Sequence, residues 1–190
     1  PDWTFCSYTA AVIYGLSVSH ANLTHIHIAA MPAQSTTPGS QVIRHRYAYR
    51  TRASQMDIAV TDIDQTITDC LVDASFVEGL IIADSALHEQ LLSKEHLVEA
   101  VNKLGLNRRG VVTARRVARC ADGLSESGGE SKARALMIER GWQVPELQVE
   151  LFDPVEPGKP YRVDYLWRVG DRLIIGEFDG FVKSEKAAEE

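Results

Sequence analysis

Two carboxylates in the last third of the chain are predicted to lie side by side on paired strands. The segments 161–169 and 172–178 both alternate like strands, and Gly170-Asp171 between them suits a two-residue hairpin turn, because glycine tolerates positive φ and aspartate hydrogen-bonds locally. A turn of two residues fixes the register and places Asp164 opposite Glu177. Like charges at this spacing destabilise a sheet unless a cation or a shared proton compensates for them.

Oxygen ligands that converge in this way suit Mg²⁺ or Mn²⁺ and metal-assisted hydrolysis of phosphodiesters. The period of two puts Asp179 on the same face as Glu177, where it is expected to pair with Arg162, and Glu130 on the preceding helix could supply a third acid. The competing interpretation is that Asp164 and Glu177 are ordinary residues at strand ends, paired with basic side chains at the solvent boundary.

The order of short motifs in the last third resembles the Vsr-like domain of the PD-(D/E)XK (restriction endonuclease-like) nuclease superfamily. The motifs are Ser127-Gly-Gly-Glu130-Ser131, Pro145-Glu-Leu-Gln148-Val149, Arg162-Val-Asp164 and Glu177-Phe-Asp179-Gly180. The resemblance implies a helix and a mixed sheet, with a metal ion held by Glu130, Asp164 and Glu177. It makes Gln148 and Lys183 secondary candidates for the catalytic site.

Upstream motifs are similar to the AbiEi-type antitoxins and transcriptional regulators, which carry such a domain at their C-terminus. They are Ala10-Ala-Val-Ile-Tyr-Gly-Leu16, the segment from Val60-Thr61 to Asp69, and Ala83-Asp84-Ser85-Ala86-Leu87. The resemblance implies a cytoplasmic DNA-binding regulator of a toxin-antitoxin pair, with a winged-helix domain expected ahead of Pro1.

One departure from the nuclease pattern divides the functional hypotheses. The pattern has a lysine two residues after the glutamate, to stabilise the attacking water or the phosphorane charge, and Asp179 stands there instead. The first hypothesis is a Mg²⁺-dependent DNA endonuclease in which Lys183 substitutes for that lysine. The second is an inactive scaffold that binds a protein partner such as a cognate toxin.

Three other patterns could carry chemistry. Asp62-Ile-Asp64-Gln65-Thr66 matches the DxDxT motif of haloacid dehalogenase-type phosphatases, but it also suits a helix capped by Asp62 with Gln65 completing a capping box. His25-Ile-His27 places two imidazoles on one face of a strand, either for Zn²⁺ or simply at the surface.

The third pattern is a basic island in an acidic chain. The net charge is −6, which argues against a protein that binds nucleic acid over its whole surface. Residues 103–119, however, contain six basic residues and no acidic one. Among them, Arg115, Arg116 and Arg119 could bind phosphates or form a solvated helix face.

Composition and patterning predict an α+β protein. The chain is 45% hydrophobic, which is enough for a packed core, and it has neither an apolar run that could span a membrane nor a signal-peptide pattern. The three cysteines lack the spacing of a disulfide framework or a zinc site, so a reducing cytoplasm is expected. We expect an antitoxin-like helical region with short strands over 1–122, and the nuclease-like domain over 123–190.

Helices are predicted over 7–16, 63–71, 80–92, 97–104, 110–121 and 130–140, and strands over 24–30, 41–47, 147–152, 161–169 and 172–178. Residues 58–60 form a short apolar run. The apolar run Leu173-Ile174-Ile175 is expected in a central strand.

Overall fold

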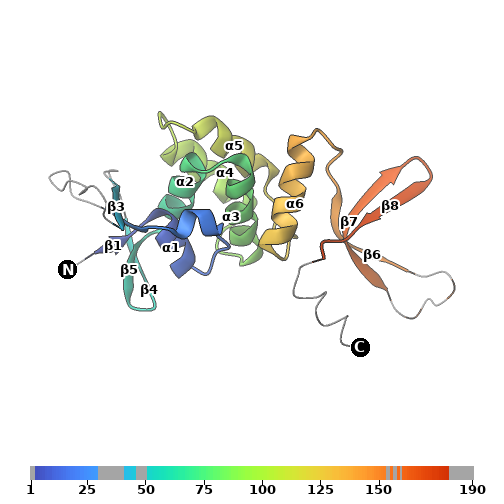
Figure 1. Cartoon of the computed structure of the whole chain (residues 1–190), viewed down its shortest axis with the longest axis horizontal. Coiled ribbons are helices and arrows are strands. Elements are labelled where there is room, and N and C mark those ends of the chain that lie inside the picture. The colour runs from blue at the N-terminus through green and yellow to red at the C-terminus, as the bar shows by residue number, and fades with distance from the viewer. Residues whose placement is uncertain are drawn as a thin grey trace.

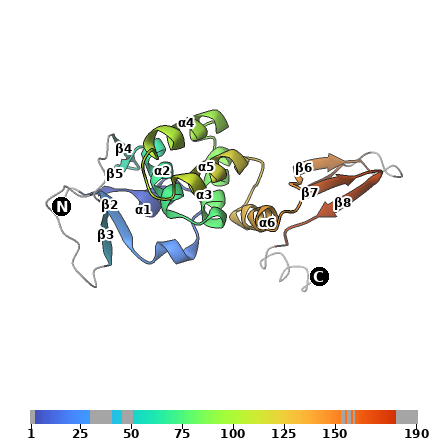
Figure 2. The same ribbon diagram turned by 90° about the horizontal axis from the view of Figure 1, so that it is seen from above.

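The computed structural model describes residues 3–29, 41–45, 51–152, 155, 158 and 160–179. It confirms the predicted α+β class. A five-stranded sheet near the N-terminus and a three-stranded sheet near the C-terminus lie at opposite ends of an elongated molecule, with the helices between them (Figures 1 and 2).

The N-terminal sheet is mixed and has the strand order β3-β2-β1-β5-β4. Its strands are β1 (Thr4–Phe5), β2 (Ile26–Ala29), β3 (Val42–His45), β4 (Arg52–Gln55) and β5 (Ile58–Thr61). β1 pairs in parallel with β5, and β2 with β3, whereas β1–β2 and β4–β5 are antiparallel. The sheet is followed directly by the helical core, because Thr61 ends β5 one residue before the cap of the next helix.

Five helices form the core of the molecule, together with the short 3₁₀ helix η1 (His20–Leu23) at its side. These five are α1 (Ser7–Ile13), α2 (Ile63–Asp73), α3 (Phe76–His88), α4 (Lys94–Leu104) and α5 (Val111–Cys120). Leu71, Leu80, Leu97 and Val117 are completely buried and come from four different helices. Side chains of Asp62, Ser75 and Ser93 cap the first backbone N–H groups of α2, α3 and α4, which fixes where each helix begins.

The sixth helix, α6 (Gly128–Glu139), packs against α3. Arg134 of α6 and Asp84 of α3 form a buried ion pair, and Ala135 of α6 belongs to the same apolar cluster as the core helices. The domain boundary between residues 122 and 123 stays a prediction. Its position falls just ahead of a helix that shares a core with the helices before it.

The C-terminal sheet consists of β6 (Glu146–Leu151), β7 (Tyr161–Val169) and β8 (Arg172–Gly176), in the order β6-β7-β8. The resemblance implied a mixed sheet at this end of the chain, but both strand pairs are antiparallel. The position of β8 also differs from the prediction. Among the described strands β8 lies at the edge and β7 in the centre, and Leu173, Ile174 and Ile175 are each about half exposed.

None of the helices in the described ranges combines the length and the apolar character needed to cross a bilayer.

Candidate functional site

The side-chain amide of Gln148 joins two of the predicted acids. Its Nε2 donates to Oε2 of Glu130 at 3.1 Å and to Oδ1 of Asp164 at 3.3 Å. Glu130 lies in the first turn of α6, Gln148 on β6 and Asp164 on β7, so three elements converge on this point. All three side chains are partly buried. The structure therefore brings together Glu130, Gln148 and Asp164, three of the candidate residues named from the sequence.

Glu130 is held in place by the loop that starts α6. Ser127 caps the helix by accepting from the backbone N–H of Glu130 at 3.1 Å, and its hydroxyl donates to Oε1 of Glu130 at 2.8 Å. The backbone N–H of Glu126 donates to Oε2 at 2.9 Å. A carboxylate in the first turn is also favoured by the helix dipole. These contacts orient the Glu130 carboxylate towards β6 and β7.

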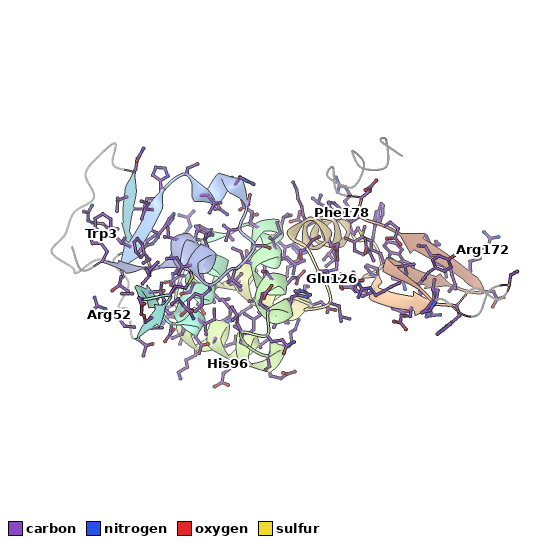
Figure 3. The ribbon with its side chains drawn as sticks, turned by 90° about the horizontal axis from the view of Figure 1, so that it is seen from below. Trp3, Arg52, His96, Glu126, Arg172 and Phe178 are labelled. Carbon is purple, nitrogen blue, oxygen red and sulfur yellow. The ribbon has the colours of Figure 1, made fainter. Side chains whose placement is uncertain are left out.

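Asp164 is fixed by the segment that follows β8. The backbone N–H of Phe178 donates to its Oδ2 at 2.8 Å. The ring of Phe178 lies so close to Gly129 of α6 that a Cβ atom at that position would overlap it. Figure 3 shows Phe178 and Glu126 at the junction between α6 and the C-terminal sheet. The segment after β8 therefore closes the site against the start of α6.

The predicted hairpin register is confirmed, but it does not reach Glu177. Val169 pairs with Arg172 and Tyr165 with Gly176, and β8 ends there. Asp164 and Glu177 occupy the next positions, and Glu177 is exposed. The expected pairing of Asp179 with Arg162 is wrong, because Arg162 forms its ion pair with Glu126 at 2.8 Å. Lys183 lies outside the described residues.

The donor chemistry at this point fits a hard cation such as Mg²⁺ or Mn²⁺. Two carboxylates face one amide, and an amide turned by half a rotation would present its oxygen to both of them. Within the described residues, no group of three or more His, Cys, Asp or Glu side chains is arranged to hold a metal ion. A cation would thus rely on Gln148 as well as on the acids and would replace the hydrogen bonds that the amide now donates.

Tyr165 lies near these acids, and their negative charge affects its pKa. Its hydroxyl donates to the backbone oxygen of Glu130 at 2.9 Å, and the side chain is buried. Burial raises the pKa of Tyr165, and the nearby charges of Glu130 and Asp164 raise it further. The phenol therefore stays protonated and serves to hold β7 against α6.

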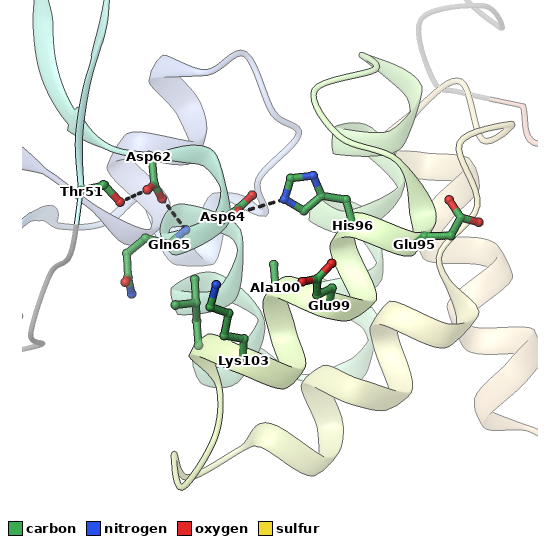
Figure 4. A pocket seen from close by; sticks show the side chains of 10 residues that line it. Thr51, Asp62, Asp64, Gln65, Glu95, His96, Glu99, Ala100 and Lys103 are labelled. Carbon is green, nitrogen blue, oxygen red and sulfur yellow. Dashed lines mark hydrogen bonds and ion pairs between the residues drawn. The ribbon is translucent and has the colours of Figure 1, made fainter.

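A hollow with a volume of about 440 Å³ lies elsewhere in the molecule, between the start of α2 and α4 (Figure 4). Asp62 caps α2 as predicted, by accepting from the backbone N–H of Gln65 at 2.8 Å. The expected capping box is wrong in its second half, because the backbone N–H of Asp62 donates to the backbone oxygen of Thr51, while the Gln65 amide donates to Asp69. Asp64 pairs with His96 of α4 at 2.9 Å. Asp62 thus has the structural role that competed with the phosphatase interpretation.

The two histidines of the His25-Ile-His27 motif have different environments. His25 is exposed, whereas His27 is buried and lies 2.7 Å from His45 of β3, measured from Nδ1 to Nε2. Burial and the neighbouring His45 lower the pKa of His27 to about 4. The sequence offered no signal for this pair, because it depends on the parallel pairing of β2 with β3.

Arg108 and Asp69 form another contact that sequence reasoning missed. Asp69 is almost fully buried, and its carboxylate accepts from both Arg108 and Gln65. Burial raises the pKa of Asp69, and the guanidinium of Arg108 opposes the rise. Arg108 therefore pairs with a buried acid and is not part of an exposed basic surface.

Comparison with known proteins gives two relatives and no functional assignment. The chain is 28% identical over 174 residues to Uncharacterized protein MT2308 of Mycobacterium tuberculosis strain CDC 1551 / Oshkosh, and equally to Uncharacterized protein Rv2248 of strain ATCC 25618 / H37Rv. The alignment covers 92% of this chain but only 61% of each relative. No protein-family model and no solved structure matches the chain.

Proposed function

We propose that the chain is part of an AbiEi-type DNA-binding regulator whose C-terminal region binds Mg²⁺ or Mn²⁺ and hydrolyses DNA phosphodiesters. The observation that carries the proposal is the convergence of Glu130 and Asp164 on the Gln148 amide. The resemblance to PD-(D/E)XK nucleases assigns Glu130 and Asp164 to the metal site and makes Gln148 a secondary candidate for the catalytic site. Glu177, one position beyond the last pair of β8, is the fourth candidate ligand.

Each residue of the proposed site has a separate role. Glu130, Asp164 and Glu177 supply negative oxygens, and Gln148 holds the first two in register. The backbone N–H of Phe178 keeps Asp164 oriented. A bound divalent cation would supply Lewis-acid activation of water and neutralise phosphate charge. Lys183 takes the place of the lysine that Asp179 replaces.

Metal binding is tested without a substrate, by the melting temperature of the chain with and without Mg²⁺ or Mn²⁺. A ligand at about 100 times its Kd stabilises the folded state by about 2.7 kcal/mol. For a chain of this size that corresponds to a rise of roughly 5–10 °C. Asp164→Asn should abolish the rise. Glu146→Gln is the matched control, because Glu146 is an exposed carboxylate of β6 paired with Arg168, and it should keep the full rise.

Hydrolysis is tested next on a labelled DNA duplex with Mn²⁺. We expect cleavage by the wild type, loss of cleavage in Asp164→Asn, and a large reduction in Lys183→Ala with an unchanged metal-induced rise in melting temperature. Absence of any metal-induced rise in the wild type would overturn the proposal.

A protein-binding scaffold is the second candidate, and the edge of the C-terminal sheet favours it. Among the described strands β8 has one unpaired edge, with three half-exposed apolar residues, and such an edge can accept a strand from another protein. Asp179 in place of the catalytic lysine supports the same candidate. If the chain is such a scaffold, Mg²⁺ and Mn²⁺ should not raise the melting temperature of the wild type or of Asp164→Asn.

A further inference from the structure

The exposed face of α5 carries a row of arginines. Ala114, Val117 and Ala118 are buried against the core, whereas Val112, Arg116 and Arg119 are exposed and Arg115 is partly exposed. Arg109 precedes the helix and is exposed as well. We call Arg109, Arg115, Arg116 and Arg119 the α5 arginines. Because residues 103–119 contain no acid, this face has no negative charge of its own.

No described carboxylate forms an ion pair with an α5 arginine. In contrast, Arg108, Arg134, Arg162 and Arg168 each pair with an acid. Two α5 arginines are instead positioned by uncharged groups. Nε of Arg115 donates to Oδ1 of Asn102 at 2.9 Å, and the guanidinium of Arg116 lies 4.1 Å from the ring centre of Phe76. Their charges are therefore held in place but not neutralised.

Most acids of the helices packed against α5 have other partners. Asp64 and Asp69 of α2 pair with His96 and Arg108, and Asp84 of α3 pairs with Arg134. Glu95 and Glu99 of α4 are exposed and line the hollow between α2 and α4. Glu78 of α3 accepts from the hydroxyl and the backbone N–H of Ser75. The positive charge of the α5 arginines is thus left facing solvent, on a chain whose net charge is −6.

We infer that the α5 arginines bind the phosphate backbone of duplex DNA. Guanidinium groups match phosphate geometry with two parallel hydrogen bonds, which a lysine cannot do. Arg115 and Arg119 are one helical turn apart, about 6 Å along the axis, so both can reach one strand of a polyanion. The proposed contact is with phosphates, which are the same in every sequence, so we expect the affinity to depend little on base sequence.

The surface is connected to the proposed site through α6. Nη1 of Arg134 donates to the backbone oxygen of Cys120 at 2.8 Å, so the C-terminal end of α5 lies against the helix that carries Glu130. The inference rests on the proposed function for the identity of its partner, DNA, but it does not require a metal or a cleavage step.

The test is fluorescence anisotropy of a labelled 20-base-pair duplex (about two helical turns), measured in EDTA at several salt concentrations. Each lost phosphate contact should reduce the slope of log K against log salt by about 0.9 and weaken binding by about tenfold at 0.1 M salt. We expect Arg116→Gln/Arg119→Gln to lose close to two units of slope. Arg140→Gln/Arg172→Gln is the matched control, because both residues are exposed arginines away from α5, and it should bind like the wild type.

Equal losses in the two double variants, or no binding of the duplex by the wild type, would overturn the inference. Tighter binding of an RNA duplex or of polyglutamate than of DNA would overturn the choice of partner. The two proposals fail separately. Asp164→Asn should keep full DNA affinity in EDTA, and the wild type should bind DNA in EDTA even if Mg²⁺ and Mn²⁺ do not raise its melting temperature. Melting temperatures of all variants confirm that they are folded.

Discussion

Asp84 and Arg134 form the most completely buried ion pair among the described residues, with exposed side-chain fractions of 0% and 2%. Nη2 of Arg134 donates to both carboxylate oxygens at 2.7 and 2.6 Å, and the backbone N–H of Asp122 donates to Oδ1 at 2.8 Å. Burial raises the pKa of Asp84, and the charge of Arg134 opposes the rise. The carboxylate thus depends on its partner to remain charged inside the protein.

Removing that partner should therefore be costly. We expect Arg134→Met to lower the free energy of unfolding by about 3–5 kcal/mol, because it leaves Asp84 buried without a counter-charge. Urea unfolding followed by circular dichroism measures the loss. Arg168→Met is the control, since Arg168 and Glu146 form a pair that is about half exposed, and its loss should stay below about 1 kcal/mol. Equal losses in the two variants would contradict this account.

Single residues also show which parts of the site a sequence can reveal. The cap at Asp62 and the position of Glu130 in the first turn of α6 follow from local rules, and both are found as predicted. That Glu130, Gln148 and Asp164 lie together was expected only from the resemblance of the motif order to nucleases, because local rules do not relate residues on three different elements. The pairing of Asp84 with Arg134 links residues 50 positions apart, and no local pattern indicates it.

At the scale of elements, the start of α6 decides whether the site can close. Two glycines stand in its first turn and face different neighbours. A Cβ atom at Gly129 would overlap the ring of Phe178, whereas one at Gly128 would lie 3.3 Å from a methyl carbon of Ile81 and could be accommodated by a small shift. The absence of a Cβ atom is therefore needed at position 129, and not at position 128, for the segment after β8 to reach Asp164.

We expect Gly129→Ala to push Phe178 away and to break its backbone hydrogen bond to Asp164. The substitution should reduce the metal-induced rise in melting temperature and increase hydrogen exchange at the Phe178 amide. Gly128→Ala, one residue earlier in the same turn, should change neither quantity. If both variants behave like the wild type, Phe178 does not hold the site closed.

The elements themselves were predicted unevenly, for physical reasons. Helical periodicity located α2 to α6, because each has an apolar face against the core. β1 (two residues) and β4 (a polar strand) are too short or too polar to produce a pattern, and both were missed. The apolar run of β8 predicts a central strand, but β8 lies at an edge of the sheet. Hydrophobicity alone does not distinguish a buried central strand from an apolar edge strand.

For the whole molecule, α6 is the element that connects the two ends. It packs on α3 through Arg134, while Tyr165 of β7 donates to the backbone oxygen of Glu130 on the same helix. A helix shared in this way couples the proposed metal site to the helical core. The stability of one end should consequently depend on the other.

This coupling can be measured with two shortened chains. A chain of residues 1–142 keeps α6 on α3, so we expect it to retain its helical circular dichroism and a cooperative thermal transition, at a lower melting temperature than the full chain. A chain of residues 1–122 leaves Asp84 without Arg134 and exposes the apolar face of α3, so it should lose the cooperative transition. If the chain that ends at residue 122 melts as cooperatively as the one that ends at 142, then α6 belongs to the C-terminal domain, as the sequence predicted.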